Sequence, residues 1–158
     1  MTERSEPGGW APARVAVADE QDRLVDVAAL SRFGERALDA AGVPATHALS
    51  IGLIGREAIA DLKGRYYGER RVTDVLAFAM DPLDAPGPAT LGDIVICVAV
   101  AEQNARGLGV PVQAELEHLI VHGILHLTGR DHADPDGELA MVREERRILS
   151  TVRVGASS

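Results

Sequence analysis

The spacing of apolar residues along the chain alternates between a period of two and the longer period of a helix. Residues 14–19 (RVAVAD) and 47–55 (HALSIGLIG) alternate apolar with other side chains, which is typical of strands. Two nearly continuous apolar segments, at residues 73–80 and 91–100, indicate strands that are buried more deeply. The pattern therefore predicts four strands.

Segments with helical spacing separate and follow these strands. A helix over residues 25–41 stops at the GVP of residues 42–44, and a helix over residues 56–67 stops near Gly68. A short helix after residue 100 stops at residues 107–109, Pro111 opens a fourth helix that Gly129 closes, and a charged fifth helix covers about 135–152. Four strands interleaved with five helices indicate an α+β fold with a small mixed sheet.

The length of 158 residues suits a single domain. We assign residues 13–153 to that domain, expect residues 1–12 to form a flexible arm because glycine and proline interrupt them, and expect residues 154–158 to fray. The chain has no run of 18 apolar residues, and residues 1–12 lack the apolar core of a signal peptide. We therefore expect a cytoplasmic protein without a membrane partner.

The formal net charge of −8 counts against a protein that coats nucleic acid through a generally basic surface. One basic stretch is nevertheless present, KGRYYGERR, with cations at Lys63, Arg65, Arg70 and Arg71. It is either a solvated helix end or a phosphate-binding face. The tyrosines at positions 66 and 67 are likewise open to two interpretations, as core residues or as rings on which unpaired bases stack.

Three of the five histidines lie within eleven residues, in HGILHLTGRDH at positions 122–132. His122 and His126 are four residues apart, about 400° around a helix, so their side chains share one face. A continuing helix would carry His132 about 240° around from His126. Gly129 offers the solution, because glycine ends helices in a left-handed turn that would bring His132 back to the pair.

Three imidazoles leave one position of a tetrahedral zinc ion open, which is the arrangement of catalytic zinc sites. Zinc lowers the pKa of a bound water to about 7, and that water would be the nucleophile. We predict one zinc per chain on His122, His126 and His132, although imidazoles suit other divalent ions too. The competing interpretation is three unrelated histidines. His118 is either a fourth ligand or a supporting neighbour, and Asp131 either orients a ligand or is an exposed turn residue.

Gly123 stands where zinc proteases with this spacing carry the glutamate that serves as general base. Glycine has no side chain to move a proton, which argues against peptide hydrolysis by the usual route. The sequence thus leaves the catalytic side chain unassigned and makes the metal the main chemical group.

The histidine segment resembles the HGxLHLxGYDH signature of the YbeY-type endoribonucleases, which are bacterial ribosomal-RNA maturation factors. TDVLAF at 73–78 and LGDIVI at 91–96 are similar to that family's TDVLSF and LGDI segments, and Met141 matches a methionine of its closing helix. The resemblance implies a small mixed sheet packed with helices, the metal-bearing helix in the centre, and one zinc on three histidines. It also implies an endonuclease for single-stranded RNA in ribosomal-RNA processing and ribosome quality control. Ribosomal RNA and ribosome-associated proteins would be its partners.

Four positions depart from that family's pattern. Arg130 replaces a tyrosine, Ala77 replaces a serine, and Val72 replaces the proline that commonly precedes the threonine. Tyr67 replaces an arginine that the family is thought to use for RNA. Two alternatives stay open: a metal hydrolase of another class, acting on peptides or small phosphoesters, and a ribosome-assembly module that binds RNA around a structural metal. The remaining candidates for RNA contacts are Arg65, Arg70 and Arg71.

Overall fold

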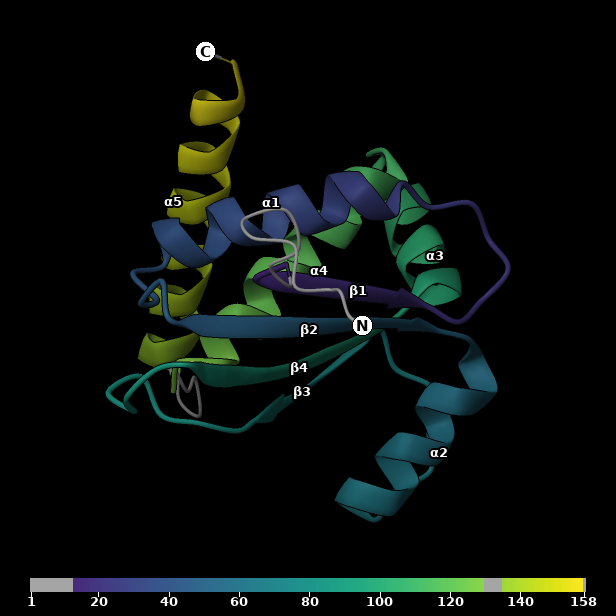
Figure 1. Cartoon of the computed structure of the whole chain (residues 1–158). Helices are drawn as coiled ribbons and strands as arrows, with labels where there is room; N and C mark the ends of the chain where they lie inside the picture. The colour runs from purple at the N-terminus through teal and green to yellow at the C-terminus, as the bar shows by residue number, and fades with distance from the viewer. Residues whose placement is uncertain (1–12, 130–134, 158) are drawn as a thin grey trace, which may run out of the picture.

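The computed structural model describes residues 13–129 and 135–157, and its centre is a four-stranded sheet (Figure 1). The strands are β1 (Val15–Asp19), β2 (His47–Ile54), β3 (Val75–Ala79) and β4 (Ala89–Cys97), in the spatial order β1-β2-β4-β3. β1, β2 and β4 run parallel, whereas β3 is antiparallel to β4. The mixed sheet that the apolar pattern predicts is confirmed.

The described residues form five helices: α1 (Val27–Ala40), α2 (Arg56–Tyr67), α3 (Val98–Leu108), α4 (Val112–Leu127) and α5 (Pro135–Ser157). α1, α4 and α5 lie together on one face of the sheet, and α2 packs on the other (Figure 1). The expected α+β class is therefore confirmed. Within the part of the chain that the structure describes, we find no helix with the length and apolar character needed to cross a bilayer.

Two hydrophobic clusters hold these layers together. The larger one joins α1, α3, α4 and α5 to the sheet, with Ile94 of β4 and Ile120 of α4 completely buried in it. The smaller one lies beneath α2 and consists of Ile54, Ile59, Leu76, Cys97 and Ala99. The lone cysteine is thus a core residue, as its apolar neighbours in the sequence predict.

Two element boundaries differ from those predicted. β4 ends at Cys97, so residues 98–100, expected to continue the strand, form the first turn of α3. These residues are largely buried, and a continuous apolar run does not distinguish a strand from a buried helix. α5 continues to Ser157, past the predicted end near residue 152, because one glycine costs a helix only about 1 kcal/mol and no proline interrupts it. The arm predicted at residues 1–12 lies outside the described residues.

α4 is the central helix of the domain. It contacts β3, β4, α1, α3 and α5, so it is surrounded on most sides. It ends at Leu127, with Thr128 as its C-cap and Gly129 at a φ of +86°. The left-handed turn expected at Gly129 is confirmed, and the helix that carries His122 and His126 is the central one, as the family resemblance implies.

Candidate metal centre and adjoining cavity

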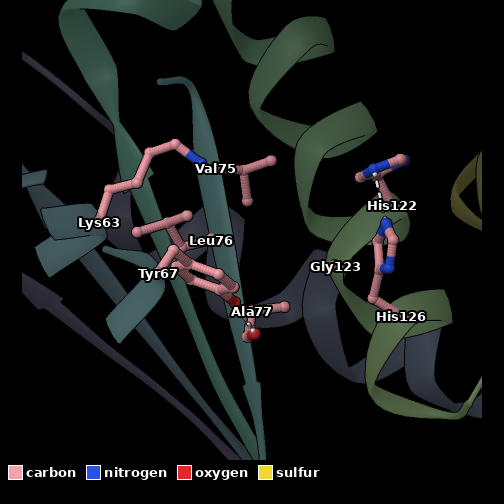
Figure 2. Close-up of a pocket in the computed structure, with 8 residues that line it drawn as sticks. All are labelled: Lys63, Tyr67, Val75, Leu76, Ala77, His122, Gly123 and His126. Carbon is pink, nitrogen blue, oxygen red and sulfur yellow. Dashed lines mark hydrogen bonds between the residues drawn. The ribbon is translucent and has the colours of Figure 1, made fainter. Parts of the chain in front are cut away.

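His122 and His126 lie on successive turns of α4 and face one another. Their Nε2 atoms are 3.0 Å apart, and the ring centroids are separated by 4.5 Å with the planes nearly perpendicular (Figure 2). The four-residue spacing thus places both rings on one face of the helix, as the sequence predicts. Two ring nitrogens at one point are what a shared metal ion requires.

The two imidazole nitrogens are spaced as ligands of one zinc ion would be. Zn–N distances of about 2.0–2.1 Å in a tetrahedral site put two ligand nitrogens roughly 3.3 Å apart, close to the 3.0 Å between these Nε2 atoms. His132, Asp131 and Arg130 lie outside the described residues. Within residues 13–129 and 135–157, no group of three side chains could hold a metal ion, so the third ligand stays a prediction from sequence.

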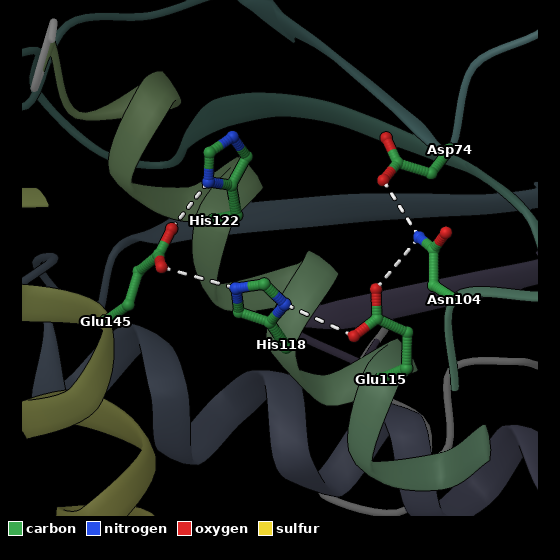
Figure 3. A network of polar contacts seen from close by, with 6 residues as sticks. All are labelled: Asp74, Asn104, Glu115, His118, His122 and Glu145. Atoms are coloured by element: carbon green, nitrogen blue, oxygen red, sulfur yellow. Dashed lines mark hydrogen bonds and ion pairs between the residues drawn. The ribbon is translucent and has the colours of Figure 1, made fainter. Parts of the chain in front are cut away.

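Glu145 of α5 fixes the orientation of the first histidine. Its Oε2 accepts a hydrogen bond of 2.5 Å from Nδ1 of His122 (Figure 3). This leaves Nε2 as the nitrogen that faces His126. Histidines that bind metals commonly donate their other ring N–H to a carboxylate in this way, which settles the tautomer and the ring orientation. Glu145 is also 93% buried, so its carboxylate needs hydrogen-bond partners inside the protein.

Sequence reasoning did not find Glu145, although a signal for it is present. In α5 the buried apolar residues Met141, Ile148 and Val152 mark one face of the helix, and Glu145 occupies the same face between them. A carboxylate on an otherwise apolar helix face needs a polar partner inside the protein. The sequence does not say which partner, because the pairing depends on how α5 crosses α4.

His118 supports this arrangement without joining the histidine pair. Its Nδ1 lies 3.3 Å from Oε1 of Glu115 and its Nε2 lies 3.3 Å from Oε1 of Glu145, so two carboxylates hold the ring. The ring centroid is 6.4 Å from that of His122. Of the two roles considered for His118, this geometry favours the supporting neighbour over the fourth ligand.

A chain of polar contacts extends from Glu115 to the start of β3. The Asn104 side-chain amide donates to Glu115 and to Asp74, both at 3.1 Å (Figure 3). Asp74 belongs to the TDVLAF segment, and Asn104 belongs to α3. The network therefore links the segment before β3 to α3, α4 and α5, and it ends at the metal-facing histidine.

The Glu145 carboxylate is held in its charged form. Burial alone would raise the pKa of Glu145, but hydrogen bonds from His118 and His122, together with their charges, outweigh burial and lower the pKa to about 2. The hydrogen bond to Glu145 raises the pKa of His118 more than burial lowers it, and the charges of Glu145 and Glu115 add to the rise. Glu145 thus remains an acceptor for His122 across the physiological pH range.

A cavity of about 250 Å³ opens beside the histidine pair. The histidines and Gly123 of α4 form one side, and α2 and β3 form the other (Figure 2). The residues from α2 and β3 are Lys63, Tyr67, Val75, Leu76 and Ala77. The cavity thus combines nitrogen ligands, one cation, one phenol and an apolar wall.

α4 packs closely onto the sheet at Gly123. A Cβ atom at this position would lie only 2.7–3.0 Å from three side-chain carbons of Ile94, which is itself fully buried. Any side chain here, a glutamate included, would have to displace the core of β4. A general base at this position would therefore require Ile94 to shift.

The three arginines considered for RNA binding do not line this cavity. Arg70 is paired with Glu57 at 2.5 Å and with Asp61 at 2.9 Å, and the hydrogen bonds to Asp61 and Glu57 raise its pKa. Arg71 lies 3.7 Å from Glu69, and Arg65 is exposed on the last turn of α2. The cation that does line the cavity is Lys63. A role in RNA contact for Arg65, Arg70 or Arg71 remains a prediction.

The two tyrosines of the basic stretch are surface residues. Tyr66 is 61% exposed and Tyr67 is 54% exposed, which excludes the interpretation as core residues. Tyr67, at the position where the resembled family has an arginine, is the one that lines the cavity.

Comparison with known proteins is consistent along nearly the whole chain. Residues 16–153 match the model of the family described as Endoribonuclease YbeY. Proteins of that name from Beutenbergia cavernae and Thermobifida fusca are each 41% identical, over 145 and 142 residues. The first alignment covers 88% of this chain and 97% of the relative, and the second covers 86% and 92%.

A solved structure has the same fold. The solution structure of TM1509 from Thermotoga maritima aligns with a TM-score of 0.62 over 87% of this chain and 88% of that one. At 24% sequence identity, this likeness supports the architecture alone.

Proposed function

This chain belongs to the Endoribonuclease YbeY family, and we propose that it is a zinc-dependent endoribonuclease specific for single-stranded RNA. The observation that carries the metal part of the proposal is the convergence of the His122 and His126 Nε2 atoms, with Glu145 holding the far side of the His122 ring. His132 completes the ligand set in this proposal, with one zinc per chain.

The residues around the cavity divide the remaining work. Glu145 keeps His122 in the tautomer whose Nε2 is available, and His118 shares the same carboxylate. The Lys63 ammonium supplies positive charge for a phosphodiester, and the apolar residues of β3 limit the water around it. A bound zinc ion would supply a Lewis acid for the phosphodiester and would make water a stronger nucleophile.

A protease is the less well supported alternative. Its general base would have to be at position 123, where the approach of Ile94 leaves no room for a side chain. A phosphodiester has a better leaving group than an amide, so it makes a smaller demand on proton transfer. Assaying casein alongside RNA separates these two kinds of hydrolase.

The proposal is tested by metal analysis and RNA cleavage on the same preparations. The purified chain should carry one zinc and cut single-stranded RNA in preference to a blunt duplex of the same sequence. His126→Ala should lose both zinc and cleavage. Gln103→Ala, an exposed change on α3, is the matched control and should keep both. Undiminished cleavage by the metal-free His126→Ala protein would refute the proposal.

We place this activity in the cytoplasm, in ribosomal-RNA maturation and ribosome quality control, with ribosomal RNA and ribosome-associated proteins as partners. The support is membership in the family, together with the sequence resemblance. A bacterial strain that lacks its own YbeY-type enzyme provides the test. The native chain should restore mature ribosomal RNA, as measured by northern blotting, and His126→Ala should not. Equal restoration by both would contradict a role for the metal in this process.

A further inference from the structure

Aromatic residues are scarce in this chain, and most of them meet at one place. The sequence has two tyrosines, two phenylalanines and one tryptophan. The ring centroids of Tyr66 and Tyr67 lie 5.2 Å and 6.1 Å from that of Phe78. We call these three residues, contributed by the end of α2 and by β3, the aromatic platform.

The platform borders the cavity that contains the histidine pair. Tyr67 lines the cavity on the side opposite His122 and His126, as Figure 2 shows. The Tyr67 hydroxyl donates a long hydrogen bond, 3.5 Å, to the carbonyl of Ala77, which holds the ring against β3. The Tyr67 ring therefore lies beside β3, across the cavity from the histidines.

The tyrosine rings are accessible from solvent. Both are more than half exposed, although large aromatic side chains gain most from burial. The Lys63 ammonium lies 5.1 Å from the centroid of the Tyr67 ring. An exposed cation–π contact is worth only about two- to fivefold in an equilibrium. A stacked base is worth roughly 5- to 150-fold in affinity, so a base would displace the ammonium.

We propose that the aromatic platform is a subsite for unpaired nucleobases next to the scissile phosphodiester, with Tyr67 and Tyr66 as the stacking rings. Lys63, displaced from the Tyr67 ring, pairs with the adjoining phosphate. This inference deepens the proposed function and rests on RNA being the substrate. Because a base within a duplex has no free face, the subsite would also account for a preference for single strands.

The size and charge of the cavity favour a base over a larger ligand. Pockets for drug-sized molecules have volumes of about 300–1,000 Å³, whereas this one measures about 250 Å³. A nucleotide matches the two α2 residues of the cavity, because its planar base can stack on the Tyr67 ring and its phosphate can pair with the Lys63 ammonium. A protein partner that covered the tyrosines instead is a distinct outcome of the test below.

Fluorine NMR gives a readout that does not depend on cleavage. The chain contains two tyrosines, both in the platform, so the full-length metal-loaded protein labelled with 3-fluorotyrosine should give two resonances, assigned with Tyr66→Phe. Adding a single-stranded RNA of about ten nucleotides should shift both resonances, and a blunt duplex should shift neither. Electrophoresis after each titration checks that the RNA remained intact.

Affinity measurements on variants separate stacking from charge. Tyr67→Ala should weaken RNA binding roughly 5- to 150-fold at every salt concentration, while Tyr67→Phe and Tyr67→Trp should stay within twofold of the native chain. Lys63→Met should instead lower the salt dependence, by about 0.7 in the slope of log affinity against log salt. Leu24→Ala, at a fully exposed apolar residue that does not line the cavity, is the matched control.

The outcomes distinguish this inference from the proposed function. If native protein cleaves RNA while both fluorine resonances stay fixed, or if Tyr67→Ala binds RNA as the native chain does, the platform is no base subsite. If RNA shifts the resonances but no preparation cleaves it, the subsite stands and the nuclease assignment fails. Resonances that respond to ribosomal proteins and not to RNA would overturn the subsite in favour of a protein partner.

Discussion

Ile94 and Gly123 are in contact where α4 crosses β4. A zinc protease would have its general-base glutamate at position 123, and the contact leaves little room for that side chain. A Cβ atom on residue 123 would meet Cδ1, Cγ1 and Cγ2 of Ile94 at 2.7, 2.9 and 3.0 Å. Ile94 is fully buried, so its side chain has no free space to turn into. The close packing at position 123 therefore also disfavours a catalytic side chain there.

We expect Gly123→Ala to destabilise the protein by up to about 2 kcal/mol, because the overpacking cost of about 1–3 kcal/mol is offset by a gain in helix propensity of about 1 kcal/mol. Gly107→Ala in α3 is the matched control, since a Cβ there meets nothing within 4 Å. That control should gain about 0.5–1 kcal/mol. Urea unfolding measures both free energies, and equal effects at the two positions would contradict tight packing at Gly123.

Glu145 is a second residue whose role can be isolated. Glu145→Gln keeps the shape of the side chain and removes the charge that holds Nδ1 of His122. We expect about 10- to 100-fold weaker zinc binding, measured by competition with a chelator. Glu144→Gln, one residue earlier, breaks the ion pair with Arg147 and should leave zinc affinity unchanged. Equal losses from both variants would indicate a general loosening of α5 instead.

At the scale of elements, the cavity lies between two units of different stability. α4 is anchored in the larger hydrophobic cluster, whereas α2 is attached through the smaller one, in which Ile59 is completely buried. Small packing units open more readily than large ones. The α2 side of the site, with Lys63 and Tyr67, therefore depends on a few apolar contacts.

We expect Ile59→Ala to cost about 2–5 kcal/mol and to accelerate hydrogen exchange mainly in α2. Ile120→Ala, at an equally buried residue of the larger cluster, should accelerate exchange throughout α1, α4 and the sheet. Exchange that rises uniformly in both variants would mean that α2 and α4 unfold as one unit.

The elements also show where sequence patterns suffice. The spacing of His122 and His126 and the glycine after α4 depend on local geometry, so the sequence predicts both correctly. The boundary between β4 and α3 was misplaced because apolar residues run through it without a period. Glu145 was missed because its contact with His122 spans 23 residues and depends on how two helices cross.

At the scale of the whole molecule, apolar packing between the helices and the sheet forms most of the core. The larger cluster joins four helices, α1, α3, α4 and α5, to the sheet through apolar side chains. If the metal had a purely structural role, the chain would need it in order to fold, as small zinc domains do. The mixed sheet and central helix instead give the site a preformed support.

We therefore expect chelation to abolish RNA cleavage without unfolding the chain. Dialysis against a chelator should leave the far-ultraviolet circular dichroism spectrum intact, and adding zinc should restore cleavage. His126→Ala treated in the same way is the control, with a spectrum that does not change and no recovery. A cooperative loss of helix on chelation would support the alternative of a structural metal.

The order of strands has one more consequence, which concerns association between molecules. Among the described residues β3 is the last strand of the sheet on the side of the cavity. The backbone N–H of Met80 donates to Leu91, and the backbone carbonyl of Asp74 accepts from Cys97, so these even-numbered residues bond to β4. Backbone groups alternate in direction along an antiparallel strand, so the carbonyl of Ala77 points away from β4 to the open margin. Unpaired margins recruit strands from other molecules. By bonding to that carbonyl, the Tyr67 phenol occupies an acceptor that a strand from a neighbouring copy would otherwise use, so one side chain both borders the cavity and covers part of the sheet margin.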